Sequence, residues 1–417
     1  MLEITAKKAS SLFSWRVDRK TGLIALAIVF MALAAFLRLS YEFWRLLFDG
    51  SRTGAIDLKI FHGLVHEWFD GTPVYRDFSH AMHPPATYLM LWPFLGWLPV
   101  AAARWLWAGT TIMATASVAY LATLGTGVKA RSERVGVVLF VVSIYATAIT
   151  IGNGQVILHL LPALLAAIIL LQRERSGWAR DLLISSLLLF SLLKPSVSVP
   201  FFWIVLFSTG ALRAFVITST GYAVLTVWAA SFQDEGPVTL IRSWLQNASQ
   251  FATLDVGYAN AHMWLGAIGL GDWGLQVSLI ALAALGLWIY WYRRSSIWLL
   301  MGVTAIVARL WTYHRLYDDL LILLPMIALF RITPGESTPR GRSRTAMVLL
   351  ALSVGLMLAP GTLLRSPSHL GTFLQVSQSL VWMSMLALLV DHAWREKRIS
   401  ANPVRPRVGG AAAAGDD

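Results

Sequence analysis

The sequence predicts an all-α, polytopic membrane protein. Of its 417 residues, 57% are hydrophobic and 13% are charged, and the mean hydropathy is +0.62. Apolar runs recur almost from end to end, as in a chain that crosses a bilayer many times. Lysine and arginine cluster at the ends of these runs and in the tails, so the net charge of +12 reflects membrane topology and predicts no nucleic-acid partner.

The first apolar segment, near 23–37, follows a basic N-terminal tail at residues 1–22. It exceeds a signal-peptide core and other apolar segments follow it, so we expect an uncleaved helix that starts in the cytoplasm. Further spans are expected near 100–124, 135–151, 155–171, 181–193, 197–210, 213–230, 272–292, 296–312, 316–330, 346–364 and 374–392. The membrane domain, residues 23–392, would then hold about twelve helices, and residues 393–417 would form a disordered cytoplasmic tail.

Two polar stretches, residues 40–99 and 231–263, are expected outside the membrane. Within the first, apolar residues from Ile56 to Trp68 recur at helical spacing, which predicts an amphipathic helix lying in the outer interface. The segment from Pro84 to Leu98 has about fifteen residues with Pro93 inside, so we expect it to dip into the outer leaflet without crossing. If it crossed, every later loop would change side.

Under this topology, polar residues gather at outer helix ends. They are Asp57, His62, His66, His83, the turn Gly152–Gln155, Lys194 with Pro195, the loop from Ser231 to His262, and Tyr313–Arg315. Each has a structural explanation as well. Asp57 can favour the dipole of its helix start, Lys194 can snorkel, and Asn153 with Gln155 can cap a hairpin. His314 with Asp318, and Arg315 with Asp319, can be helix-end pairs. Their convergence on one face favours a site, because polar groups at a membrane boundary need hydration or partners.

Five short motifs carry a family resemblance. They are Gly71-Thr72-Pro73-Val74-Tyr75, His83-Pro84-Pro85, Gly154-Gln155, Lys194-Pro195 and Trp311-Thr312-Tyr313-His314, all after Asp57 in its amphipathic segment. In this order they resemble the bacterial GT-C glycosyltransferases of the DUF2029 type, over roughly Leu23 to Arg331. That family includes polyprenol-phosphate-mannose-dependent mannosyltransferases and a related arabinofuranosyltransferase. His83 stands where the family usually has tyrosine, a difference that concerns the acceptor more than the fold.

The resemblance implies a GT-C-type bundle in the bacterial plasma membrane, with its active site on the extracytoplasmic side. A mannose-like hexose, or arabinofuranose, would move from a polyprenyl-phosphate donor to a lipid or glycan hydroxyl. Asp57 is the candidate general base, since a sugar hydroxyl is a weak nucleophile. Lys194, His314 and Arg315 are candidates to stabilise the donor phosphate. The substrate-binding candidates are Tyr75, His83, Asn153, Gln155 and Trp264.

Direct displacement needs one base, whereas double displacement needs a second carboxylate, for which Asp77 or Asp318 could be considered. Trp68, Tyr75 and Trp264 could stack on sugars, although a position in an aromatic belt is the default explanation for each. The chain has no cysteine, and we expect neither a cofactor nor a metal, because no cluster has metal-ligand spacing. The sequence also lacks a Gly-rich nucleotide fingerprint after a strand.

Two other classes of function remain open. A transporter or lipid flippase should show internal repeats and ionisable groups near the bilayer midplane, whereas here the polar groups gather at outer helix ends. A non-catalytic partner in an envelope complex would tolerate replacement of Asp57.

Overall fold

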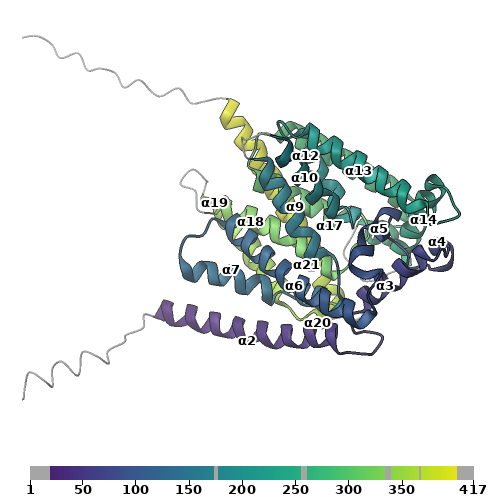
Figure 1. Ribbon diagram of the computed structural model, residues 1–417. Coiled ribbons are helices and arrows are strands. Elements are labelled where there is room, and N and C mark those ends of the chain that lie inside the picture. The colour runs from purple at the N-terminus through teal and green to yellow at the C-terminus, as the bar shows by residue number, and fades with distance from the viewer. Residues whose placement is uncertain (1–18, 173–176, 255–260, 334–339, 366–367, 402–417) are drawn as a thin grey trace, which may run out of the picture.

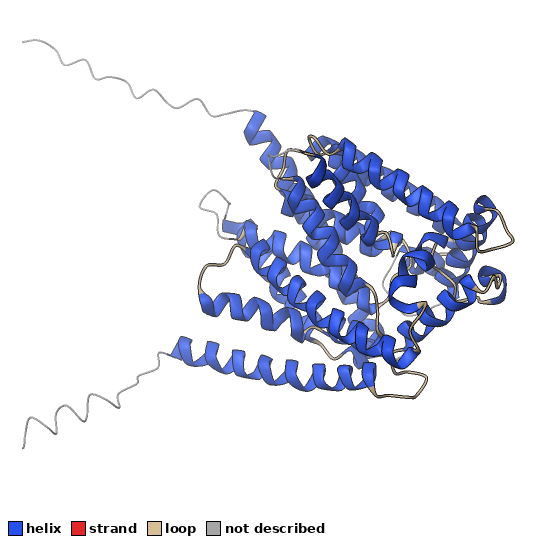
Figure 2. Cartoon of the chain, in the orientation of Figure 1, coloured by secondary structure: helices blue, strands red, loops and turns tan. Residues whose placement is uncertain are grey.

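The computed structural model describes residues 19–172, 177–254, 261–333, 340–365 and 368–401. Every regular element among these residues is a helix, which confirms the all-α prediction (Figure 2). The described chain ends, at Arg19 and Ala401, lie on one side of the molecule (Figure 1). The helices around Asp57 lie on the opposite side.

The first half of the chain forms one flank and one end of the bundle. Its helices are α2 (Arg19–Leu47), α3 (Ile56–Phe69), α4 (Val74–Asp77), α5 (Pro85–Leu95), α6 (Val100–Thr126), α7 (Arg131–Ser143), α8 (Tyr145–Asn153), α9 (Ile157–Leu171) and α10 (Trp178–Ser191). Helix α2 packs along α6, α7 and α8. The Arg104 guanidinium of α6 caps the end of α2 by donating to the carbonyls of Leu46 at 2.5 Å and of Arg45 and Asp49 at 2.9 Å.

The second half supplies the remaining helices. They are α11 (Pro195–Ser198), η1 (Val199–Phe201), α12 (Phe202–Phe207), α13 (Leu212–Ala230), α14 (Pro237–Leu254), α15 (Ala261–Ala267), η2 (Gly271–Trp273), α16 (Gly274–Tyr292), α17 (Ile297–Leu310), η3 (Leu316–Ile322), α18 (Leu323–Ile332), α19 (Arg340–Leu358), α20 (Gly361–Arg365) and α21 (His369–Ala401). Helix α17 is almost fully buried and packs against α16, α18, α21 and η3, so the core centres on it.

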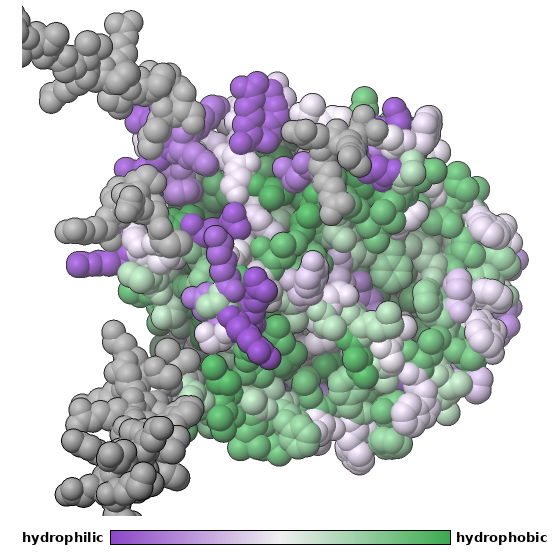
Figure 3. Space-filling model, turned by 60° about the vertical axis from the view of Figure 1, so that its left-hand side comes forward, coloured by the Kyte–Doolittle hydropathy of each residue, from purple (hydrophilic) through white to green (hydrophobic). Residues whose placement is uncertain are grey.

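Among the described residues, five helices are long and apolar enough to cross a membrane. They span Ala25–Leu47, Leu212–Ala230, Gly271–Tyr292, Gly341–Leu358 and His369–Arg398. Three bent pairs of helices raise the number of candidate crossings to eight at most. The chain is therefore a multi-pass membrane protein by composition and helix length. Figure 3 shows one face of the molecule, which is broadly apolar, as expected for a surface in contact with lipid. Hydrophilic residues gather on the side where the described chain ends lie.

The expected count of about twelve spans is not confirmed. The segments expected as separate spans near 181–193 and 197–210 form one pair, Trp178–Ser191 and Pro195–Phe207, bent by 119° at Lys194-Pro195. The 135–151 segment also breaks, with a bend of 49° between α7 and α8. Helices α9 and α17, with 15 and 14 residues, are shorter than the roughly 20 residues that span a bilayer. Hydropathy detects the apolar runs, whereas helix breaks determine how many cross.

The Pro84–Leu98 segment contains α5, which meets α6 at 96°. The two helices together have the composition of a broken span or a re-entrant loop, so the expected dip into the outer leaflet stays a prediction. At the other end of the chain, the tail expected from residue 393 begins as the last turns of α21. Asp391 and Arg395, an ion pair at 2.9 Å and i,i+4 spacing, support this extension.

The amphipathic segment near Asp57 does form a helix, α3, but its apolar face packs on protein. Leu58, Phe61, Leu64, Val65 and Trp68 are all at most 2% exposed. The Trp68 ring stacks on Tyr88 of α5 with centroids 4.7 Å apart, and its Nε1 donates to the Ala229 carbonyl at 2.9 Å. The expected insertion of this face into the membrane interface is therefore not seen, because α5 and the end of α13 already cover it.

The absence of native cysteine makes the topology testable by single-cysteine labelling. Ser51 lies in the exposed loop before α3, and Ser132 is exposed in the first turn of α7. We expect a membrane-impermeant maleimide to label Ser51→Cys in intact cells and Ser132→Cys only after permeabilisation. The reverse pattern would place the Asp57 side in the cytoplasm.

Candidate functional site

A buried ion pair between Lys194 and Asp318 lies at the centre of the polar residues. Lys194 Nζ is 2.5 Å from Asp318 Oδ1, and the two side chains are 12% and 1% exposed. Lys194 lies at the elbow where α10 ends, because Pro195 has no amide N–H and starts the new helix α11. Asp318 lies in the first turn of η3, so the pair joins an elbow to a helix start.

The Asp318 carboxylate organises the loop before η3. Its Oδ2 accepts hydrogen bonds from His314 Nδ1 at 3.0 Å and from the Arg315 amide at 3.2 Å. The predicted contact of His314 with Asp318 is thus confirmed. Lys194 Nζ also lies 4.7 Å from the centroid of the Tyr317 ring, a cation–π contact that the sequence analysis did not anticipate. With these partners, Asp318 is not available as the second carboxylate of a double displacement.

Asp57 reaches this cluster through the turn after α8. Gly154 ends α8 with φ +70°, and a Cβ at that position would lie 2.5 Å from the Leu58 Cβ. Glycine therefore permits both the left-handed turn and the close approach of α3. The Ala55 amide at the start of α3 donates to the Gly152 carbonyl at 3.0 Å, which fixes the first turn of α3 against α8.

Burial and nearby polar groups act on the Asp57 carboxyl in opposite directions. Burial raises the pKa of Asp57 above its usual value. The positive charge of Arg315, the Gln155 amide, the Lys194 charge and the Asn153 amide all act in the opposite direction. Among the described residues, Asp57 Oδ2 is buried and has no hydrogen-bond partner. A buried carboxylate oxygen of this kind carries a desolvation cost unless a ligand or proton satisfies it.

Asn153 is held in turn by α2. Its Oδ1 accepts a hydrogen bond from Arg45 Nη2 at 3.3 Å, and Arg45 is paired with Glu42 at 2.6 Å. This support from Glu42 and Arg45 was not predicted. The signal was present, however, as two opposite charges at i,i+3 spacing at the end of an apolar helix.

His83 joins the cluster as a neutral ring. Burial and, to a smaller extent, the Lys194 charge lower the pKa of His83 to about 3, although Asp318 opposes the shift. The ring lies edge-on to Phe61, with centroids 4.7 Å apart. Tyr75 Oη donates to the His83 carbonyl at 2.6 Å and so fixes the backbone before Pro84.

The structure thus brings seven predicted residues together, and two others take different places. The seven are Asp57, His83, Asn153, Gln155, Lys194, His314 and Arg315. The buried Tyr75 ring packs edge-on to Trp68, so it supports His83 and does not offer a flat stacking face to that cluster. Trp264 is 42% exposed on α15, and no described contact joins it to the cluster. Asp77, considered as a nucleophile, pairs with Arg76 at the surface.

A second buried network lies behind η3. Asp319 does not form the expected helix-end pair with Arg315, because it pairs with Arg309 and accepts a hydrogen bond from Tyr145. Gln378 of α21 donates to the same tyrosine hydroxyl at 2.9 Å. These residues lie within apolar helices, where a charged pair signals either a site or an anchor. Here they join η3 to α8, α17 and α21.

The described residues contain no group of three or more His, Cys, Asp or Glu side chains able to hold a metal ion. No protein-family model, curated protein or solved structure was found to match the chain.

The central ion pair predicts a large loss of stability when one partner is removed. Asp318→Asn should lower the free energy of unfolding by about 3 to 5 kcal/mol, because Lys194 would stay buried without its counter-charge. The control Asp77→Asn removes an exposed pair and should cost no more than about 1 kcal/mol. Chemical denaturation of detergent-purified protein measures both. Equal effects of the two substitutions would contradict a central role for the pair.

Proposed function

We propose that this protein is a membrane glycosyltransferase of the GT-C type that uses a polyprenyl-phosphate sugar as donor. One observation carries the proposal: a half-buried carboxylate with an unpartnered oxygen, Asp57, shares its surroundings with the cations Lys194 and Arg315. Such a site offers a proton acceptor beside an anion-binding group. The resemblance to the DUF2029 type supports the same assignment, with sugar transfer on the outer face of a bacterial plasma membrane.

The chemistry follows from these groups. An acceptor hydroxyl oxygen forms a bond to the anomeric carbon while its proton passes to Asp57. The bond between that carbon and the phosphate oxygen breaks, and its electron pair stays on the departing lipid phosphate. Lys194 and Arg315 stabilise the charge that develops there, since charge-assisted hydrogen bonds to phosphate are strong. With Asp57 as the single base, the displacement is direct and inverts the anomeric centre.

The role of His314 depends on its proton. Its Nδ1 faces the Asp318 carboxylate, so a neutral ring carries its hydrogen on Nδ1 and presents a lone pair at Nε2. In that state Nε2 cannot donate to a phosphate. Burial lowers the pKa of His314 although Asp318 opposes the shift, which favours the neutral ring. We therefore assign the phosphate contacts to Lys194 and Arg315.

An apolar cavity next to the cluster supports a lipid-linked donor. It has a volume of about 410 Å³ between α5, α13 and α14, and it begins at Pro84 and Pro85, directly after His83. Ala223, Val227 and Val238 are among its lining residues. Such walls suit a hydrocarbon chain, whose burial yields roughly 0.8 kcal/mol per CH₂ group. A phosphate near Lys194 with its chain in this cavity would explain both features.

The role of Asp57 is tested by Asp57→Asn, which keeps the shape and removes the base. Turnover should fall by about 10² to 10⁴. The matched control is Asp70→Asn, the same change at the exposed end of α3, which should keep wild-type turnover. Sugar transfer by reconstituted protein, with a labelled polyprenyl-phosphate sugar and a bacterial lipid extract, measures both. Wild-type turnover in Asp57→Asn would show that Asp57 is not the general base and only serves the start of α3. Absence of transfer by the unmodified protein would instead favour a flippase or a structural partner.

Stability gives an independent reading of the same variant. The pKa of Asp57 is raised in the folded protein, so folding disfavours its ionised form. This carboxyl therefore lowers the free energy of unfolding once the pH rises above its pKa in the unfolded chain. Below that pKa it has no such effect. Asp57→Asn should therefore keep or raise the Tm at pH 7. A lower Tm would show that the carboxylate serves the fold.

The donor class is tested by filling the apolar cavity. Ala223→Trp should raise the KM for a long-chain polyprenyl-phosphate sugar at least tenfold, and change it little for a short-chain analogue. Val224→Trp is the control, because this exposed neighbour on α13 does not line the cavity. GDP- and UDP-sugars should give no transfer. Transfer from a nucleotide sugar without polyprenyl phosphate would refute the proposed donor.

A further inference from the structure

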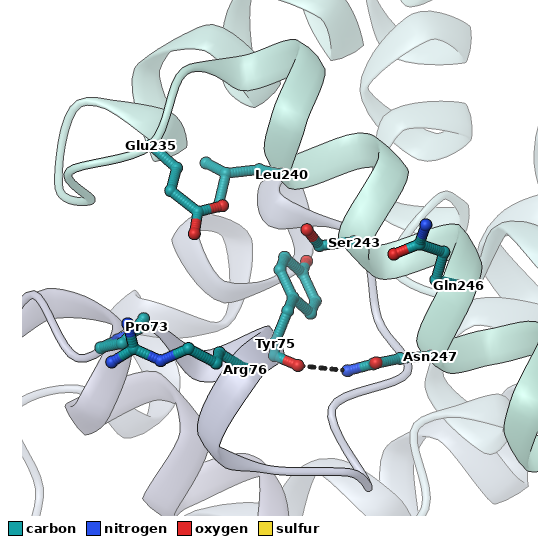
Figure 4. A pocket seen from close by; sticks show the side chains of 8 residues that line it. All are labelled: Pro73, Tyr75, Arg76, Glu235, Leu240, Ser243, Gln246 and Asn247. Carbon is teal, nitrogen blue, oxygen red and sulfur yellow. Dashed lines mark hydrogen bonds between the residues drawn. The ribbon is translucent and has the colours of Figure 1, made fainter.

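A separate polar cavity lies between α4 and α14 (Figure 4). Its volume is about 260 Å³. Among its lining side chains are Tyr75, Arg76, Glu235, Ser243, Gln246 and Asn247. Except for Tyr75, none of these residues was expected from the sequence to contact a substrate.

The walls of this cavity are held in place by specific contacts. Ser243, Gln246 and Asn247 project from one face of α14, since they are three and four residues apart. Asn247 Nδ2 donates to the Tyr75 carbonyl at 2.8 Å, as Figure 4 shows, and Trp244 Nε1 donates to the Met82 carbonyl at 2.8 Å. These two bonds clamp α14 onto the chain between α4 and His83. The cavity is therefore a built feature of the fold.

The charges of the cavity favour an uncharged ligand. Arg76 pairs with Asp77 at 2.9 Å. Asp77 and Glu235 both raise the pKa of Arg76, so the guanidinium lies in the field of two carboxylates. Two carboxylates thus surround one guanidinium, and this excess of negative charge disfavours an anion such as phosphate. The hydroxyl, amide and carboxylate groups instead offer donors and acceptors to a ligand that carries several hydroxyls.

Size limits the ligand further. The volume lies just below the roughly 300 to 1,000 Å³ of pockets for drug-sized molecules, so one small polar ring fits better than a lipid chain. Tyr75 borders the cavity and donates to the His83 carbonyl, which connects the cavity to the catalytic cluster through one side chain. One side chain, Tyr75, would thus separate the ligand from the backbone of His83.

We infer that this cavity binds one uncharged sugar residue of the acceptor, which makes the acceptor a glycan or glycolipid. The assignment of this sugar to the acceptor rests on the proposed function, whereas binding of a sugar to the cavity can be tested without catalysis. Glu235 accepts hydrogen bonds from ring hydroxyls, and the Gln246 amide both donates to them and accepts from them. A sugar in the cavity would contact Tyr75, whose hydroxyl is hydrogen-bonded to the His83 carbonyl.

The test is binding of methyl glycosides to detergent-purified protein, measured by saturation-transfer NMR. The probes are methyl α-mannopyranoside, methyl α-glucopyranoside and methyl α-arabinofuranoside, with inorganic phosphate as a competitor. We expect at least one glycoside to bind and phosphate not to displace it. Ser243→Tyr, which fills the cavity, should abolish binding. Gln246→Ala should weaken it about tenfold, or about 1.4 kcal/mol.

The control variant is Ser249→Tyr, on the same helix but at an exposed position outside the cavity. It should bind as wild type does. Binding should also persist in Asp57→Asn, so this readout is separate from turnover. Failure of all three glycosides, unchanged binding in Ser243→Tyr, or displacement by phosphate would each overturn the inference. Glycoside binding without sugar transfer from any donor would refute the proposed function and leave a carbohydrate-binding cavity.

Discussion

The ion pair between Lys194 and Asp318 is the interaction on which the polar interior depends. Two charges almost removed from water are tolerated only with a close counter-charge and further hydrogen bonds, and Asp318 obtains these from His314 and the Arg315 amide. The pair ties an elbow in one helical segment to the first turn of another. The cations assigned to the donor phosphate thus owe their positions to one carboxylate.

Broken helices create the space for this cluster. In such an apolar chain, each helix break exposes backbone polar groups, which must be buried in protein or line a water-filled cavity. The structure places three such breaks together: Gly154 after α8, Lys194 before α11, and Arg315 before η3. Side chains at the breaks therefore supply both the structural hydrogen bonds and the groups proposed to bind phosphate. Unbroken helices would have carried the same residues to separate places on the membrane surface.

The sequence predicts the members of the site better than their arrangement. Asp57, Lys194 and His314 could be found because polar residues at the ends of apolar runs are conspicuous. Helix breaks, in contrast, depend on how Pro195 and its neighbours pack, so the number of spans could not be read from hydropathy. The pairing of Asp319 with Arg309, ten residues away and across an irregular turn, likewise depends on the folded path of the chain. Tyr75 was recognised, but its ring contacts with Trp68 of α3 and Tyr88 of α5 depend on how these helices pack, which no local pattern reveals.

The neighbouring carboxylates of η3 have a mechanical consequence. Successive side chains of a 3₁₀ helix point about a third of a turn apart, so Asp318 holds Lys194 and His314 while Asp319 holds Arg309 and Tyr145. Any rotation of η3 about its axis would break a charged contact on one side or the other. This wall of the site is rigid, whereas the first turn of α3 is joined to α8 by a neutral backbone hydrogen bond. A substrate that needs room would therefore shift the first turn of α3, and Asp57 with it. The proposed phosphate-binding residues beside η3 would keep their positions.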